Sequence, residues 1–449
     1  MDSKISFPRL SPFQTIIAGF AGVILLGSIL LMLPVSSADH TWTPFINCLF
    51  TATSSTCVTG LVVYDTATHW SVFGQIILLI LIQMGGMGVV TVATSLAMLT
   101  GKKLGLAQRN TMQESVAAPQ MGGVLKYTLF IVKYIFILEG IGALLLMPVM
   151  IRDFGAVKGI YYAIFHSISA FCNAGFDLMG VNGEFSSLTG YSSDIYFNVV
   201  IMSLIIVGGI GFLTWKDVRE HGIHLKKYRM QSKVILVTTL ILLVLPAVFF
   251  YFHEFTSSNW SSLSGTQKVL ASLFTSVTAR TAGFNTIDMG SLSGSSKTIM
   301  IVLMLIGGST GSTAGGMKTT TIAVLILSMI AVFRRREYTT AFGRRIPSAT
   351  VKNAFAIFAM YIFIFLCGAV IINCADGLDM GDCLFEAASA MGTVGVTAGI
   401  TTSLGTLSKI VIMIIMFWGR MGGLTLIYAA MSSKEVLKYK LPESNINVG

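Results

Sequence analysis

The chain has 449 residues, of which 54% are hydrophobic and only 11% are charged. This balance excludes an ordinary soluble domain and predicts an all-α protein that crosses a membrane several times. The net charge of +10 would suit nucleic acid, but the basic residues cluster between apolar runs, so we expect no nucleic-acid partner.

The first apolar run, Phe13–Leu33, is long enough to span a bilayer, and a shorter apolar segment and a second long run follow it. A signal peptide is the alternative for this run, but it lacks a clear cleavage site and opens a repeat, so we expect a retained span. The order of span, short segment and span recurs with a period of about 110 residues. The predicted segments are Phe13–Leu33, Thr43–Gly60 and Val72–Leu99; Lys126–Met150, Gly159–Gly175 and Ile195–Trp215; Ser232–Phe252, Thr266–Gly283 and Thr298–Val332; and Val351–Asn373, Met380–Gly395 and Leu407–Met431.

This pattern predicts four tandem span–pore–span repeats, with eight transmembrane helices and four re-entrant pore helices around a central pore. The repeats occupy residues 1–110, 111–225, 226–345 and 346–449. We expect an intramembrane gating loop in the third repeat and a cytoplasmic tail at the end of the fourth.

The basic clusters predict the topology. Positive residues mark the cytoplasmic side of a membrane, and one cluster separates each repeat from the next. If the middle segments crossed fully, successive clusters would alternate between sides. We therefore expect the middle segments to dip in and return, with both termini in the cytoplasm of a plasma-membrane protein. The clusters are Lys102–Arg109, Lys216–Lys233, Arg334–Lys352 and Lys434–Lys440, with Lys4 and Arg9 at the start.

Each short segment ends in a Ser/Thr/Ala-rich run and then a three-residue strip that closes with glycine. The strips are Val58, Thr59 and Gly60; Asn173, Ala174 and Gly175; Thr281, Ala282 and Gly283; and Thr393, Val394 and Gly395. Backbone carbonyls can replace the water around a potassium ion, and glycine lets the chain approach the pore axis and turn. The helix before each strip would direct its negative C-terminal end at a cation. Ordinary glycine turns are the alternative, but four matching copies favour a potassium selectivity filter.

The second span of each repeat contains paired glycines: Gln83–Gly88, Val207–Gly211, Gly307–Gly316 and Gly419–Gly423. We expect close helix packing in the first, second and fourth copies. The third copy is too rich in small and polar residues for a stable helix and predicts a loop beneath the filter, acting as a gate. A simple packing break is the alternative. The loop residues are Gly307, Gly308, Ser309, Thr310, Gly311, Ser312, Thr313, Ala314, Gly315 and Gly316.

Two charged residues near the loop, Arg420 and Lys318, lie at membrane depth, where an ionisable side chain is a functional candidate, and two more, Arg280 and Glu386, lie beside the strips. Arg420 would donate to loop carbonyls and hold the gate shut, or else tie to a carboxylate such as Glu139. Lys318 directly follows the loop and is assigned to the gate. Arg280 precedes the third strip and would brace the filter, with Glu386 as its partner or as an attractor of cations at the mouth.

The four span–pore–span units, the string T-x-R-T-A-G-F-N at Thr278–Asn285, the loop Gly307–Gly316 and Arg420 resemble the Trk, Ktr and HKT superfamily of potassium transporters. The similarity extends over nearly the whole chain. The chain length is most similar to the membrane subunit of bacterial Ktr systems.

This resemblance implies that Gly60, Gly175, Gly283 and Gly395 are the filter glycines of a potassium-selective pore. It also implies a homodimer with one pore per protomer and a cytosolic ring of nucleotide-binding regulatory subunits that controls the loop. The chain itself has no Walker or dinucleotide-binding motif, so we expect it to carry no cofactor, with potassium as transported ion and nucleotide only on the partner.

Two other functions are alternatives to a potassium pore. A sodium-coupled secondary carrier would tend to have inverted repeats and midplane carboxylates, whereas these repeats are parallel and membrane carboxylates are few. A membrane enzyme is excluded more firmly, because the chain has no HExxH motif and no nucleophile constellation.

Overall fold

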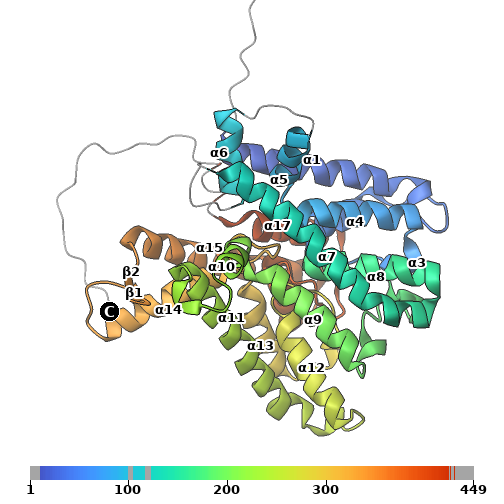
Figure 1. The fold of residues 1–449 in the computed structure, drawn as a ribbon. Helices are drawn as coiled ribbons and strands as arrows, with labels where there is room; N and C mark the ends of the chain where they lie inside the picture. Colours follow the sequence, from blue (N-terminus) through green and yellow to red (C-terminus); the bar gives the residue numbers. More distant parts are fainter. Residues whose placement is uncertain (1–10, 100–104, 117–122, 424, 426–428, 430–449) are drawn as a thin grey trace, which may run out of the picture.

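A computed structural model describes the chain except for residues 1–10, 100–104, 117–122, 424, 426–428 and 430–449. Its described part is almost entirely helical (Figure 1). Helix starts follow local sequence signals, because Ser or Asp side chains accept hydrogen bonds from the first free N–H groups. Such caps are Ser11, Ser71, Asp194, Ser264, Ser293 and Asp379.

Four helices of the described chain are each long and apolar enough to cross a membrane unaided. They are α1 (Pro12–Met32), α7 (Val124–Phe154), α11 (Met230–Phe249), which continues as a π-helix over Phe250–Phe255, and α15 (Ser348–Asp376). At 1.5 Å per residue each reaches the roughly 30 Å of a hydrocarbon core. They match the first predicted span of each repeat.

A short, largely buried helix follows each long one and packs against it. These helices are α2 (Phe45–Cys57), α8 (Ala156–Phe171), α12 (Gly265–Thr278) and α16 (Met380–Gly392). Each has 13 to 16 residues, too few to cross a bilayer.

The second predicted spans are broken, and our expectation of continuous helices over Val72–Leu99 and Ile195–Trp215 is wrong. Helices α4 (Val72–Met87) and α5 (Val89–Leu99) meet at Gly88 with a bend of 95°. Helices α9 (Ile195–Ile210) and α10 (Phe212–His221) meet at Gly211 with a bend of 98°. Both glycines have positive φ, of 85° and 100°, which ends a right-handed helix.

In the third and fourth units the corresponding helices also stop early. Helix α13 (Gly294–Leu305) is separated from α14 (Thr319–Phe333) by the predicted loop. Helix α17 (Thr406–Met421) ends at Gly422, and the rest of the predicted span to Met431 lies mostly outside the described residues.

The remaining elements are small. They are α3 (Thr66–His69), α6 (Leu106–Ser115) and an antiparallel hairpin of β1 (Thr340–Ala341) and β2 (Arg344–Arg345), in which Thr340 faces Arg345. In Figure 1, α6 and the hairpin lie toward one end of the molecule, and α3 lies at the opposite end.

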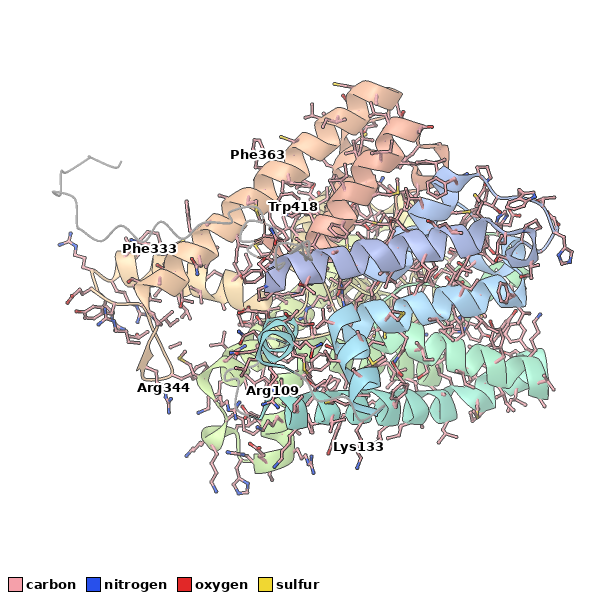
Figure 2. All side chains as sticks on the ribbon, turned by 90° about the horizontal axis from the view of Figure 1, so that it is seen from above. Arg109, Lys133, Phe333, Arg344, Phe363 and Trp418 are labelled. Atoms are coloured by element: carbon pink, nitrogen blue, oxygen red, sulfur yellow. The ribbon has the colours of Figure 1, made fainter. Side chains whose placement is uncertain are left out.

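The core sits where the short helices meet the broken ones. Phe50 and Phe385 are fully buried in one cluster, and Phe171 and Phe274 in another. Large apolar side chains are exposed on the outer helix faces, as lipid contact requires. Phe333 and Phe363, exposed by 75% and 68%, lie at the outer edge of the molecule in Figure 2.

Candidate functional site

Every strip begins with a residue in the left-handed conformation, within three residues of the end of its short helix. The φ angles are 57° at Val58, 60° at Asn173, 62° at Thr281 and 50° at Thr393. Left-handed residues other than glycine are costly and terminate helices. The same exceptional conformation at four equivalent positions means that one backbone structure is built four times.

The strip glycines form a closed ring in chain order. A methyl group on Gly60 would lie 2.6 Å from the carbonyl oxygen of Ala174, and one on Gly175 would lie 2.9 Å from that of Ala282. The pattern continues from Gly283 to Val394, at 2.8 Å, and closes from Gly395 to Thr59. All four glycines also have positive φ, between 70° and 97°. Each position therefore excludes a side chain on two grounds, backbone conformation and contact with the next strip.

The N–H groups of the strips turn away from the ring. The middle residues Thr59, Ala174 and Val394 each donate to a backbone carbonyl of their own short helix at 2.8 Å, and Ala282 donates to Thr278 at 3.1 Å. Because these donors are satisfied behind the strip, the carbonyls near the ring remain free to accept a cation in place of a protein donor.

Hydroxyl groups of the short helices hold the strips, a role that our sequence analysis missed. Ser54 and Ser389 accept the N–H groups of Gly60 and Gly395, at 3.1 and 3.0 Å. Ser169 donates to the carbonyl of Phe176 at 2.6 Å, and Thr278 donates to that of Phe284 at 2.5 Å. The signal was present as a Ser or Thr five or six residues before each strip glycine.

A single cavity of about 230 Å³ is lined by all four strip glycines. Asp65, Asp177 and Asp288 also line it, from the segments that follow the first three strips. Three carboxyl groups around a narrow opening raise the local concentration of cations. Geometry and charge at this mouth therefore suit a positive ion.

The predicted loop, Gly307–Gly316, lies directly against two strips. The hydroxyl of Thr313 is 3.0 Å from Oδ1 of Asn173, in the second strip. Gly315 faces the hydroxyl of Thr393, the first residue of the fourth strip, with no room for a side chain between them. The loop closes on itself through a hydrogen bond from Gly307 N–H to the carbonyl of Met317 at 2.8 Å.

The glycine motifs of the second and fourth units hold the loop through backbone groups. Ser309 donates to the carbonyl of Gly209 at 3.0 Å, and Gly316 donates to that of Gly419 at 3.1 Å. In return Phe212, at the start of α10, donates to the carbonyl of Gly311 at 2.6 Å. A helix end leaves its last carbonyls without partners, so the breaks in α9 and α17 supply acceptors at membrane depth.

The glycine motifs of the first, second and fourth units also pack closely against neighbouring helices, as expected. The helix breaks within them were not expected. A methyl group on Gly86 would lie 2.6 Å from Sγ of Cys172, and methyl groups on Gly208 and Gly419 would collide with carbonyls at the ends of α8 and α16. Close packing therefore concerns the early glycines of each motif, whereas Gly88, Gly211 and Gly422 end the helices.

Arg420 lies in the last turn of α17, since that helix ends at Gly422. Its guanidinium donates to the carbonyls of Thr313, in the loop, and of Gly85 and Gly86, at the end of α4. Arg420 thereby joins the loop to the first unit. The tie to Glu139 is absent; that carboxylate instead accepts from Gln83 at 3.0 Å.

Lys318 also binds the loop rather than a carboxylate. Its Nζ donates to the carbonyl of Ala314 at 2.8 Å and to that of Gly315 at 3.4 Å. Two cationic side chains therefore hold neighbouring loop carbonyls next to the strips.

The pairing of Arg280 with Glu386, one of the two roles suggested for Glu386, is not found in the structure. Among the described residues neither forms an ion pair, and Glu386 accepts from the hydroxyls of Thr397, at 2.8 Å, and Thr401. Glu386 is fully buried and does not line the mouth cavity. The two residues are 106 positions apart, and nothing local in the sequence indicated that hydroxyl groups would satisfy this carboxylate.

The chain is similar to known cation transport proteins. A family model described as TrkH, cation transport protein, matches residues 2–439. The chain is 37% identical to the potassium/sodium uptake protein NtpJ of Enterococcus hirae, covering 98% of both chains. It is 36% identical to Ktr system potassium uptake protein B of Bacillus subtilis, covering 100% of this chain and 99% of that protein. The crystal structure of the potassium transporter TrkH from Vibrio parahaemolyticus shares the fold, with a TM-score of 0.72 over 95% of this chain and 86% of that chain at 18% identity.

Apolar spanning helices, a family match over nearly the whole chain and a shared transporter fold define a multi-pass membrane transporter of cations. The chain belongs to the TrkH family of cation transport proteins, which are transporters and not enzymes. Membership of the Trk and Ktr superfamily, predicted from the sequence, is confirmed.

Proposed function

We propose that this protein takes up potassium across the plasma membrane through a filter of backbone carbonyls. The observation that carries the proposal is the closed ring of Gly60, Gly175, Gly283 and Gly395, in which each glycine lies against a carbonyl of the next strip. Carbonyl rings of this kind replace the hydration shell of potassium. The relatives named potassium uptake proteins support the same ion.

The architecture that we propose has eight spans and four pore helices. The units 1–110, 111–225, 226–345 and 346–449 surround the ring, and each broken helix counts as one span. The basic segments that contain α6 and the β-hairpin lie at the same end of the molecule, away from α3, which supports cytoplasmic termini (Figure 1).

We further propose that the loop Gly307–Gly316 is the gate. It lies against the second and fourth strips, and Arg420 and Lys318 bind its carbonyls. Backbone hydrogen bonds to Gly209 and Gly419 keep it in place. A loop in this position under the strips blocks the ion path. Ions would pass when the loop moves and its hydrogen bonds are replaced by others.

Regulation would come from outside this chain. The relatives carry the words "Ktr system" in their names, which supports a separate partner subunit. We propose a homodimer that docks on a cytosolic, nucleotide-binding regulatory ring, with no cofactor in the membrane subunit.

A sodium-coupled carrier is the second candidate, favoured by one observation. The relative NtpJ is named a potassium/sodium uptake protein. In a carrier, sodium would be required for potassium movement and would be taken up with it in a fixed ratio. In a pore, potassium would move down its own gradient without sodium.

The test is ion flux in liposomes that contain the purified protein, with potassium or sodium as the only cation and with or without the regulatory ring. We expect potassium flux in the absence of sodium, and stimulation by the ring. Potassium flux that needs sodium at a fixed ratio would establish the carrier instead.

A further inference from the structure

The position nine residues before each strip glycine is occupied by four different residues: Thr51, His166, Phe274 and Glu386. All four lie in the short helices and are buried. Three of them, Thr51, His166 and Glu386, have polar side chains. A buried polar group needs a defined partner, so their partners indicate what these positions do.

His166 connects its helix to the segment beyond the second strip. Its Nδ1 lies 2.7 Å from the carbonyl of Tyr162, which can only accept, so Nδ1 carries the proton. Nε2 is then an acceptor, and it receives the backbone N–H of Leu178 at 3.2 Å. Leu178 comes three residues after Gly175.

Glu386 makes the equivalent connection in the fourth unit. One carboxylate oxygen accepts from the hydroxyl of Thr397 at 2.8 Å, and the other accepts from that of Thr401. Thr397 comes two residues after Gly395, and its own hydroxyl accepts the N–H of Gly399 at 2.9 Å. The chain beyond the fourth strip is thus anchored to its pore helix.

The first and third units lack this connection. The hydroxyl of Thr51 donates within its own helix, to the carbonyl of Asn47 at 2.9 Å, and Phe274 has no polar group. The outer segment of the second unit holds their chains instead. Phe185 donates to Asp65 at 2.9 Å, and Leu188 donates to the carbonyl of Asn285 at 3.0 Å.

We propose that His166 and Glu386 are positioning residues, which hold the outer ends of the second and fourth strips and thereby set the preference for potassium over sodium. The ring order places these strips opposite each other, so the two connections steady the filter from both sides. Discrimination between ions requires that the carbonyls keep their spacing, and supporting hydrogen bonds provide that constraint. The proposal rests on the filter function proposed above.

The test compares potassium and sodium flux through the full-length protein in liposomes. Glu386→Leu and His166→Phe remove the acceptors, whereas Glu386→Gln keeps the shape and one acceptor oxygen. We expect the potassium-to-sodium flux ratio to fall by roughly threefold to tenfold in the first two variants, corresponding to about 0.7–1.4 kcal/mol. Glu386→Gln should stay within about twofold of the unchanged protein.

Thr51→Val, three residues before the anchoring Ser54 as His166 and Glu386 are before Ser169 and Ser389, is the matched control and should leave the ratio unchanged. If Glu386→Leu fails to fold, Thr401→Val removes the donor to one carboxylate oxygen while Thr397 still binds the other, and it should lower the ratio in the same direction. Gly60→Ser, in the ring itself, serves as the reference.

The positioning role would be overturned if the flux ratio changed in Gly60→Ser but stayed unchanged in folded His166→Phe and also in folded Glu386→Leu or Thr401→Val. The filter function would then remain intact. An unchanged ratio in all variants, Gly60→Ser included, would overturn the filter function itself. Equal losses in Glu386→Leu and Thr51→Val would mean that the position matters only for packing, which also overturns the proposal.

Discussion

At the scale of single residues, both the backbone conformation and the contact with the next strip exclude a side chain at each glycine of the ring. Gly60 has a φ of 95°, and a methyl group there would collide with the carbonyl of Ala174 in the next strip. Gly22, in α1, has neither constraint, since nothing lies within 4 Å of an added methyl group. The two positions therefore form a natural comparison.

We predict that Gly60→Ser weakens potassium preference, because the strip must shift and its carbonyls lose their spacing. In a strain that lacks other potassium uptake, growth should need roughly tenfold more external potassium, and relative sodium entry should rise. Gly22→Ser should grow like the unchanged protein. Unaltered selectivity in both Gly60→Ser and Gly283→Ser would contradict the filter assignment.

The carboxyl group of Asp177, at the mouth cavity, adds a dependence on external pH. Burial and, to a smaller degree, the negative charge of Asp65 raise its pKa to about 6, against the hydrogen bonds from Met179 and Ser187. A raised pKa means that Asp177 is neutral below about pH 6 and negative above it, so its attraction for cations is lost on acidification.

We expect the apparent affinity for external potassium to weaken as the outside pH falls through about 6. The change should be roughly fivefold or less, since a unit charge acting over about 4 Å of water contributes about 1 kcal/mol. Uptake rates measured at several potassium concentrations and pH values test this. Asp177→Asn should abolish the pH effect, whereas Asp382→Asn, whose carboxylate pairs with Lys297 at 3.1 Å, should retain it.

At the scale of elements, the broken helices explain how a loop is stable at membrane depth. Each break frees carbonyls that water cannot reach, and the loop and Arg420 supply the missing donors. Gly85, Gly86, Gly209 and Gly419 all accept hydrogen bonds in this way. The helix breaks and the loop therefore stabilise one another through these hydrogen bonds.

We predict that shortening the loop by several residues within Gly308–Ala314 raises ion flux and makes it less dependent on the regulatory partner. Arg420→Ala should shift flux in the same direction, because the carbonyl of Thr313 loses its donor and that of Gly85 keeps only the N–H of Gly88. Arg420→Lys should give an intermediate effect, since an ammonium group cannot reproduce the guanidinium fork. A well-folded loop deletion with unchanged flux and partner dependence would place the gate elsewhere.

At the scale of the whole molecule, the arrangement separates a basic end from the end that carries the mouth. Residues 216–233 and 334–352 carry basic clusters, whereas we propose that the segment that includes Val181 and Phe185, beyond the second strip, faces the outside of the cell. Ile223 and Phe342 are exposed by 91% and 55%, so cysteines at these sites would be accessible to a reagent on their own side.

Single cysteines at Ile223 and Phe342, in a background without reactive native thiols, should resist an impermeant thiol reagent added to intact cells. Val181→Cys, exposed by 42% in the native chain, should react and serves as the control. After permeabilisation all three should react. Labelling of Ile223→Cys or Phe342→Cys from outside would mean that one of the short helices crosses the membrane completely.

The sequence by itself determined the apolar class, the places of the short helices and strips, the loop and the family. These features are local: a helix that ends in a left-handed residue and a glycine is encoded within about ten residues, and the pattern is repeated four times. The spacing of hydroxyl groups before each strip was visible as well, although its meaning was not recognised.

Only the tertiary structure decided which groups meet. Glu386 lies on Thr397 and Thr401 rather than on Arg280, and Arg420 reaches Gly85, a residue 335 positions away, rather than Glu139. The breaks at Gly88 and Gly211 were equally hidden, because paired glycines suit both a continuous packed helix and a broken one. A broken helix is stable only where donors from distant parts of the chain satisfy the carbonyls that the break frees. The local sequence pattern does not indicate which distant residues supply these donors.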